Sequence, residues 1–213
     1  MKGRWAAGIM PRNFAWVIRD SLAVSERPGG YARNHRQVRR QEEIVWLQVN
    51  GFTRVVSLLG SPHNLHAYDQ ANLAWTHIPF GPCTEPGLVL PRLYRQLDHW
   101  HRDGQQVLVH QEELGDRLMG AVGGYLIWAG KLALPAQVVT VVERMLRRQM
   151  GPEGRALVTL ALELHPSRPA APAPPAAPAP PAAPVSPTAP APPTAPAPPA
   201  GIALPEGGLD GAT

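Results

Sequence analysis

One segment of the sequence combines residue types that could bind an anion. Residues 107–128 read VLVHQEELGDRLMGAVGGYLIW, in which an apolar run ends at His110 and Arg117 begins a long apolar stretch. This order predicts a buried strand, a short polar loop and a helix with an arginine in its first turn. The free N–H groups of a helix N-terminus and the planar guanidinium of an arginine both bind phosphate. The segment therefore predicts the frame of an anion pocket.

The loop of this segment is acidic and lacks a nucleophile. The residues between His110 and Arg117 include three carboxylates and no thiol or hydroxyl: Gln111, Glu112, Glu113, Leu114, Gly115 and Asp116. Each close carboxylate would repel a phosphate dianion by about 1 kcal/mol, and Arg117 would offset about one of them. We therefore expect the loop to repel phosphate. An internal ion pair between Arg117 and one of these acids is favoured over a Mg²⁺ site built from the three carboxylates.

Alternating strands and helices surround this segment. Strands are predicted at 13–25, 53–60, 74–80 and 105–110, and helices at 36–50, 91–104, 117–130, 135–149 and 153–165, with a short helix or a loop at 63–73. This order predicts an α/β fold with a mostly parallel central sheet flanked by helices. Ligands of such sheets bind at the carboxyl ends of the strands, so residues 110–117 form the candidate site.

Two of the predicted helices carry more specific expectations. In the helix at 36–50, Val38, Ile44 or Val45, and Leu47 or Gln48 stand at helical spacing, so we expect them to share one face. In the helix at 91–104, Pro91 is expected in the first turn, after a loop that contains prolines.

Composition divides the chain into three parts. Residues 166–200 consist almost entirely of Pro and Ala, and the chain holds 26 prolines in 213 residues. We expect an N-terminal arm at 1–12, the α/β domain at 13–165 and a disordered Pro/Ala-rich tail at 166–213. Because proline fixes φ and lacks an N–H donor, the tail is expected to be a polyproline II spacer or a ligand for aromatic grooves.

The domain is weakly basic. The tail contains one basic and two acidic residues, so residues 1–165 hold 19 of the 20 Lys and Arg and 14 of the 16 Asp and Glu, a net charge of +5. This charge is too diffuse to indicate nucleic acid, and the densest basic run, 33–40, is expected to be a solvated face. No stretch reads as a signal peptide or is long enough to span a bilayer. The sequence therefore predicts a cytoplasmic protein without a nucleic-acid or membrane partner.

No cofactor or metal site is expected. Cys83 is the single cysteine, which excludes a disulfide framework and a cysteine-based zinc site, and a lone cysteine is usually a small apolar residue. The other candidate metal ligands are scattered histidines without an acidic partner: His63, His66, His77, His99 and His101.

Several segments resemble the cysteine-dependent dual-specificity protein phosphatases, in particular the small atypical type. The resemblance covers most of residues 13–160. NFAWVIRDSLAVSERP at 13–28 resembles the first strands of that family, WLQVNGFTRVVSLL at 46–59 a helix and strand, and HIPF at 77–80 the strand before the general-acid loop. Residues 107–128 resemble the family signature, in which a strand ends in His-Cys, five residues follow, and an arginine begins a helix.

The resemblance implies a chemistry that this sequence carries only in part. In the family, a cysteine thiolate attacks phosphorus, the arginine binds two phosphate oxygens, an aspartate protonates the leaving group, and a hydroxyl residue follows the arginine. His110 and Arg117 match this pattern. Gln111 stands in place of the cysteine, Phe80 in place of the aspartate and Leu118 in place of the hydroxyl residue.

These replacements predict a pseudophosphatase, which is a catalytically inactive protein that serves as a binding or regulatory module. Its expected partner is a protein, either a phosphoprotein or a basic segment attracted to the loop acids. Gly115 lies one position after the usual glycine of the family, so the loop is not expected to form a tight anion nest. The alternative function is a weak or nonstandard phosphatase that hydrolyses phosphate monoesters. A third hypothesis is a plain α/β domain with a structural role. It predicts that Arg117 is buried in an ion pair and that the domain has no concave pocket.

Overall fold

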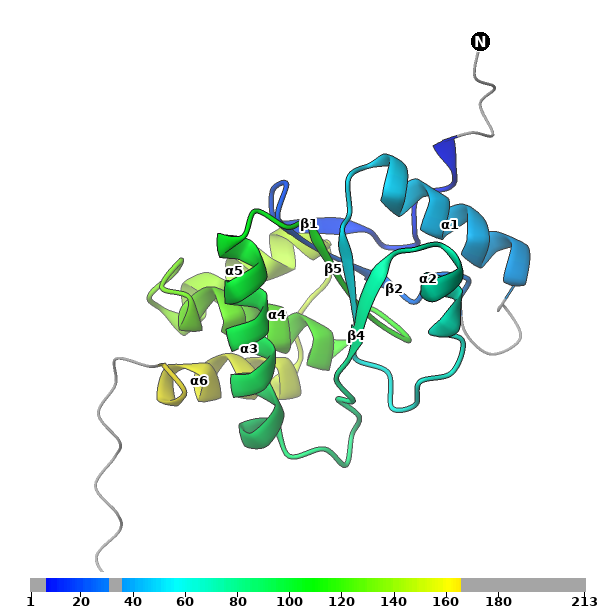
Figure 1. Cartoon of the computed structure of the whole chain (residues 1–213). Coiled ribbons are helices and arrows are strands. Elements are labelled where there is room, and N and C mark those ends of the chain that lie inside the picture. Colours follow the sequence, from blue (N-terminus) through cyan, green and yellow to red (C-terminus); the bar gives the residue numbers. More distant parts are fainter. Residues whose placement is uncertain (1–6, 31–35, 166–213) are drawn as a thin grey trace, which may run out of the picture. The chain divides into compact units, whose positions relative to one another are not determined.

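The protein contains a five-stranded sheet with helices on both faces (Figure 1). The computed structural model describes residues 7–30 and 36–165. The strands are β1 (Ala15–Ile18), β2 (Leu22–Glu26), β3 (Arg54–Ser57), β4 (Ala74–His77) and β5 (Val107–Gln111), in the spatial order β1-β2-β5-β3-β4. β1 and β2 are antiparallel, whereas the other three neighbouring pairs are parallel. The mostly parallel sheet expected from the sequence is confirmed.

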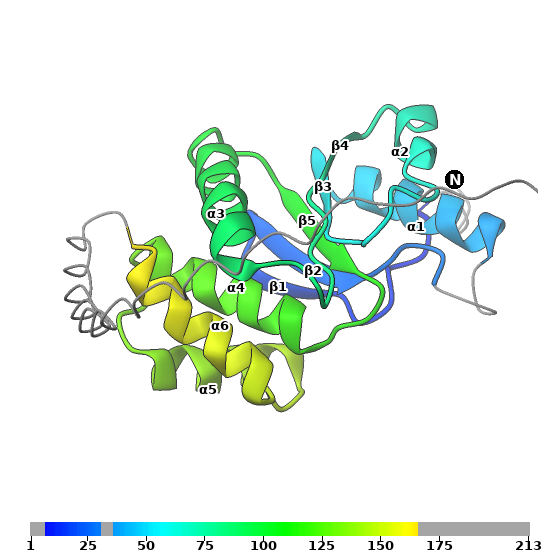
Figure 2. The same ribbon diagram turned by 90° about the horizontal axis from the view of Figure 1, so that it is seen from below.

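The helices form one layer on each side of this sheet. They are α1 (Gln37–Val49), α2 (His66–Gln70), α3 (Pro86–Arg102), α4 (Asp116–Trp128), α5 (Pro135–Leu146) and α6 (Pro152–Glu163). α1 and α2 cover one face, and α3, α4, α5 and α6 cover the other (Figure 2).

The central strands are apolar because both of their faces are covered. In β5, Val107 and Val109 belong to the core under α3–α6, and Leu108 between them belongs to the core under α1 and α2. β2 alternates in the same way, with Leu22 and Val24 on the first side and Ala23 on the second. Continuous apolar runs are typical of parallel strands that are buried on both faces.

α3 begins at Pro86, so the prediction that Pro91 starts this helix is wrong. Glu85 caps the helix, since its Oε1 accepts a hydrogen bond from the Gly87 N–H at 3.5 Å, and Pro86 occupies the first turn. Pro91 lies inside the helix, where its missing N–H removes one backbone hydrogen bond. The buried side chains of Leu90 and Leu93 flank it and hold the helix on the core.

α1 buries Ile44 and Leu47, as their helical spacing predicts, but not Val38. Val38 is 70% exposed, whereas Ile44 is 2% exposed. Arg40 and Glu43 are buried instead of Val38. The apolar spacing was misleading at Val38 because the buried face of α1 carries charged side chains.

Glycines allow α4 to approach α6 closely. A Cβ atom on Gly120 of α4 would lie 2.7 Å from the carbonyl oxygen of Gly154 in α6. Such a distance is too short for any side chain, so only glycine fits at position 120 without a shift of the backbone. The contact brings the first turns of the two helices side by side.

Some predictions fall outside the described residues. Residues 166–213, which include the predicted Pro/Ala-rich tail, and parts of the N-terminal arm and of the basic run at 33–40 belong to this group. Within the described ranges, every helix is too short or too polar to cross a membrane.

Candidate functional site

The loop predicted to be the site lies at the carboxyl ends of the parallel strands. β5 ends at Gln111, and α4 begins at Asp116. Glu26, the last residue of β2, pairs with Gln111, and Ser57 at the end of β3 pairs with His110. The loops that follow β2, β4 and β5 therefore converge at this edge of the sheet.

Gln111, at the predicted nucleophile position, is tied to the loop after β4. Its side-chain Nε2 donates a hydrogen bond to the carbonyl oxygen of Phe80 at 2.8 Å. Phe80, at the predicted general-acid position, is fully buried in the core under α3–α6. Neither residue presents a group that attacks phosphorus or donates a proton.

Arg117 is held by contacts on several sides. Its Nε lies 2.6 Å from Oε1 of Glu153, in the first turn of α6, and its Nη2 donates to the carbonyl oxygen of Pro82 at 3.0 Å. The guanidinium carbon lies 4.9 Å from the centre of the Phe80 ring, which is within the range of a cation–π contact. Nε and Nη1 are both buried and neither makes a hydrogen bond among the described residues, so the contact of Nε with Glu153 is an ion pair without hydrogen-bond geometry; the side chain as a whole is 14% exposed.

The prediction that Arg117 pairs with an acid of its own loop is wrong. Glu112 pairs with Arg27 of the loop after β2, where Nη1 of Arg27 lies 3.1 and 3.3 Å from the two carboxylate oxygens. Asp116 accepts a hydrogen bond from the N–H of Gly151 at 3.0 Å, just before α6. Glu112 and Asp116 are therefore both engaged away from Arg117, whereas Glu113 is exposed and has neither an ion pair nor a side-chain hydrogen bond among the described residues.

Arg27 also supports the loop after β3. Its Nη2 donates to the carbonyl oxygen of His63 at 3.1 Å, and its side chain is only 11% exposed. The Glu112 side chain opposite is 47% exposed. Arg27 is therefore a largely buried cation, and its ion pair with the half-exposed Glu112 neutralises the first carboxylate of the loop.

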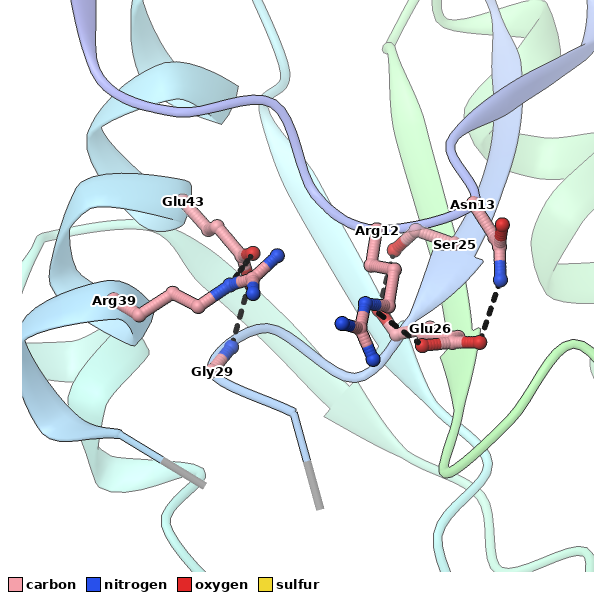
Figure 3. A network of polar contacts seen from close by, with 7 residues as sticks. All are labelled: Arg12, Asn13, Ser25, Glu26, Gly29, Arg39 and Glu43. Atoms are coloured by element: carbon pink, nitrogen blue, oxygen red, sulfur yellow. Dashed lines mark hydrogen bonds and ion pairs between the residues drawn. The ribbon is translucent and has the colours of Figure 1, made fainter. Parts of the chain in front are cut away.

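The segment that carries Arg27 is anchored on the side of β2. Glu26 accepts a hydrogen bond from Nδ2 of Asn13 at 2.6 Å and lies 4.0 Å from Nε of Arg12 (Figure 3). Glu26 is itself buried, so these two partners compensate for its removal from water.

The same segment is anchored on the side of α1. The N–H of Gly29 donates to Oε2 of Glu43 at 2.6 Å, and the other oxygen of Glu43 accepts from Nε of Arg39 at 2.7 Å (Figure 3). Glu43 is 1% exposed. This buried carboxylate fixes the turn and thereby the position of Arg27.

His110 is fully buried beneath the loop. Burial lowers the pKa of its imidazole to about 3, with smaller contributions from the positive charge of Arg27 and from His77. The hydroxyl of Tyr68 lies 3.2 Å from its Nε2, and burial raises the pKa of that phenol. The ring is therefore neutral at physiological pH and positions the end of β5.

The remaining predicted positions are structural. Leu114 and Leu118 are buried in the core, and Gly115 has an extended backbone (φ −95°, ψ 178°) immediately before α4. Cys83 is exposed in the loop after β4. Among the residues that the structure describes, no group of three or more His, Cys, Asp or Glu side chains could hold a metal ion.

Sequence reasoning missed the two residues that decide the charge of the site. Arg27 and Glu153 lie far from the loop in sequence, in the RPGG turn and in the first turn of α6. The only available signal was general: an arginine directly after a parallel strand lies at the same edge as the candidate loop.

Comparisons with known proteins address the fold. No model of a known protein family matches the chain. No curated protein matches it. Solved structures do match: kinase associated phosphatase, with a serine substituted for its catalytic cysteine, gives a TM-score of 0.60 at 16% identity over 70% of this chain and 93% of that chain. Human DUSP28 gives 0.55 at 17% identity, over 74% of this chain and 97% of its own. Tk-PTP in its active form gives 0.56 at 20% identity, over 71% and 96%.

This chain has the fold of the dual-specificity phosphatases. These solved structures confirm the resemblance in fold predicted from the sequence, because this chain matches each of them over most of its length. Because the sequence identities are only 16–20%, these structures show a similarity in fold and nothing further. What the loop can do is therefore argued from its own contacts.

Proposed function

We propose that this chain is a catalytically inactive protein with the dual-specificity phosphatase fold, a pseudophosphatase, and that it serves as a binding or regulatory module. The observation that carries the proposal is that Gln111, an amide, stands at the position of the nucleophile and is hydrogen-bonded to Phe80. An amide nitrogen has no lone pair basic enough to displace an alcohol from phosphorus, and this one donates its N–H to Phe80. The first step of thiolate-based phosphate hydrolysis therefore has no substitute here.

The contacts of Arg117 support the same proposal. Phosphate recognition by arginine requires two free N–H donors in a fork. In this chain, Glu153 lies against Nε of Arg117 and the carbonyl oxygen of Pro82 accepts a hydrogen bond from Nη2. The Phe80 ring lies over one face of the guanidinium. An oxyanion would have to displace Glu153 before it could bind.

Hydrolysis of an aryl phosphate by the purified full chain tests the proposal. We expect turnover no higher than that of an Arg117→Ala variant, with an active dual-specificity phosphatase as the positive control. Saturable hydrolysis that vanadate inhibits, and that Arg117→Ala abolishes, would overturn the proposal.

The alternative is a weak or nonstandard phosphatase, and the intact order of strand, loop and helix around His110 and Arg117 favours it. The nearest thiol to consider is Cys83, which is exposed in the loop whose Pro82 contacts Arg117. If any hydrolysis is observed, its loss in Cys83→Ser would assign the nucleophile, and its persistence would exclude this thiol.

For the partner, we propose a protein segment with basic residues. Glu113 is exposed and has no ion pair among the described residues, Glu112 beside it in the loop is half-exposed, and the half-exposed Glu153 of α6 contacts Arg117. A phosphoprotein is the less favoured partner because Arg117 is already engaged. Binding of a lysine-rich peptide is expected to weaken with Glu113→Lys and to stay unchanged with Glu163→Lys, an exposed acid at the far end of α6. Equal effects of the two variants would contradict this assignment.

A further inference from the structure

Exposed apolar side chains gather around α1. Among the described residues, the large hydrophobic side chains that remain exposed are Ile9, Met10, Val38, Val45, Val49, Leu88 and Leu134. Three of these lie on α1, and Ile9 and Met10 belong to a segment that runs beside it, since the N–H of Ile9 donates to the carbonyl oxygen of Glu42 at 3.1 Å. Apolar side chains gathered on one face of a soluble protein mark an interaction surface.

The exposed valines of α1 form one stripe. Val38, Val45 and Val49 are spaced by seven and four residues, so they project from the same side of the helix. Gln41 and Gln48, which are also exposed, stand at the intervening positions along this stripe. A repeat of this kind, with spacings of three and four residues, is the pattern by which two helices pack against each other.

The polar groups of this face are complementary to a second copy of itself. The glutamine amides can both donate and accept hydrogen bonds, although Nε2 of Gln48 already donates to the carbonyl oxygen of Ala71. The stripe itself (Val38, Gln41, Val45, Gln48 and Val49) contains no carboxylate, Glu43 is buried, and Glu42, beside the stripe, is partly buried. Two such faces can therefore meet without opposing carboxylates.

The ends of α1 favour an antiparallel arrangement. The last turn of the helix carries no basic residue, so nothing on the helix itself balances the negative end of its dipole. Arg36, at the opposite end, is exposed. An antiparallel second helix brings its own Arg36 to the unbalanced end.

We infer that α1 is the contact of a symmetric dimer, in which α1 of a second copy lies antiparallel across a twofold axis. The midpoint between Val38 and Val49 falls between Glu43 and Ile44, at the centre of α1 (Gln37–Val49). Val38 of each copy then packs on Val49 of the other, and the two Val45 side chains meet close to the axis. A groove of about 310 Å³ between α1 and α2, lined by Ile44, Val45 and Ala67 among others, flanks this contact. The inference is independent of the function proposed for the loop.

Sedimentation equilibrium of the full chain tests the dimer. In a Cys83→Ser background, which excludes disulfide dimers, we expect the mass to rise with concentration from 23.0 kDa toward twice that value. Val38→Glu, at a position 70% exposed, is expected to keep the protein monomeric and folded, as checked by circular dichroism. Leu134→Glu, at a position 64% exposed outside α1, is the matched control and should dimerise like the parent. A parent that stays monomeric, or a control that loses dimerisation equally, overturns the inference.

Disulfide trapping in the same background tests the orientation. A mixture of Val38→Cys and Val49→Cys chains is expected to form a crosslinked heterodimer. Val38→Cys alone is expected to stay uncrosslinked, since its two copies would lie about 16 Å apart along the helix axis, beyond disulfide reach. Crosslinking of Val38→Cys alone without the mixed product would indicate parallel helices and overturn the arrangement.

Discussion

Arg117 is held by contacts within the protein: Nη2 donates a hydrogen bond to the carbonyl oxygen of Pro82, and Nε forms an ion pair with Glu153. Glu153 supplies a carboxylate at 2.6 Å, which is where an oxyanion would otherwise approach the guanidinium. Gln111 fills the position of a nucleophile with an amide that closes onto Phe80. The ion pair of Glu153 and the hydrogen bond of Gln111 thus tie the loop between β5 and α4 to its neighbours.

A thiol at position 111 is expected to remain inert. In Gln111→Cys with Cys83→Ser, Arg117 stays paired with Glu153, so nothing strongly stabilises the thiolate. The alkylation rate with iodoacetamide, measured against pH, should give a thiol pKa near the ordinary value of about 8.5, and aryl phosphate hydrolysis should remain undetectable. A much lower thiol pKa together with turnover would show that we have overrated the Glu153 contact.

His110 should make the stability of the protein depend on acid pH. Its pKa is lowered to about 3 in the folded state, mainly by burial, whereas the unfolded chain titrates near the model-compound value of 6.5. Between these values only the unfolded state binds the proton, so stability that is complete above pH 6.5 is lost as the pH falls toward 3. Urea unfolding at about pH 7.5 and about pH 5 should show a loss on the order of 2 kcal/mol from this group. His110→Asn should reduce the pH dependence by that amount, and an unchanged dependence would contradict the assignment.

At the scale of elements, the close packing of α4 on α6 determines the charge of the loop. Gly120 allows the two helices to approach, and the same contact brings Glu153 to Arg117 and the N–H of Gly151 to Asp116. The chemistry of the loop is therefore set by a helix that follows it by more than twenty residues in the sequence.

Removal of the Glu153 carboxylate should expose Arg117 to anions. We expect Glu153→Gln to bind tungstate more tightly than the parent, by up to about fivefold, because an ion pair with a half-exposed partner contributes at most about 1 kcal/mol. Isothermal titration calorimetry measures the affinity, and Glu163→Gln on the same helix is the control. No gain in affinity for Glu153→Gln would mean that the shape of the loop, and not this ion pair, excludes the anion.

A methyl group at Gly120 should separate the two helices. The added Cβ would lie 2.7 Å from the backbone of Gly154, which cannot move aside as a flexible side chain does. We expect Gly120→Ala to lower the free energy of unfolding by about 1–3 kcal/mol despite the better helix propensity of alanine. Gly87→Ala in α3, where the nearest atom is a side-chain oxygen of Glu85 at 3.7 Å, should leave stability unchanged or slightly higher. Denaturant titrations of both variants make the comparison.

At the scale of the whole molecule, the order of elements follows from the apolar patterns of the sequence. The apolar runs at 53–60 and 105–110 predict buried parallel strands, and the parallel pairing of β3 with β5 confirms this. The start of α3 was misplaced because Pro86 and Pro91 give the same local signal, and only packing shows which one lies in the first turn.

The electrostatics of the site were the least predictable part. Local sequence shows that Glu112, Asp116 and Arg117 are neighbours, but each of them pairs with a residue from another loop or helix. Such pairings depend on tertiary geometry, so spacing along the chain cannot reveal them. The prediction that the nucleophile is missing, by contrast, depends only on the identity of residue 111, which the sequence gives directly.

Residues 166–213 are expected to be dispensable for folding. Among the described residues, the two hydrophobic clusters extend from Phe14 to Leu164, and we expect these residues to form a stable core by themselves. A chain that ends at residue 165 should have a free energy of unfolding within about 0.5 kcal/mol of the full chain. A larger loss in chemical denaturation would show that the Pro/Ala-rich segment packs on the domain.

Cys83 provides a position at which the surroundings of Arg117 can be probed with a fluorescent label. It is exposed and is the single thiol of the chain, and its neighbour Pro82 receives a hydrogen bond from Arg117. An environment-sensitive fluorophore can therefore be attached at one defined point without any substitution. Its emission would report directly on any molecule that loosens Arg117, so the native chain can serve as its own sensor in a screen for ligands.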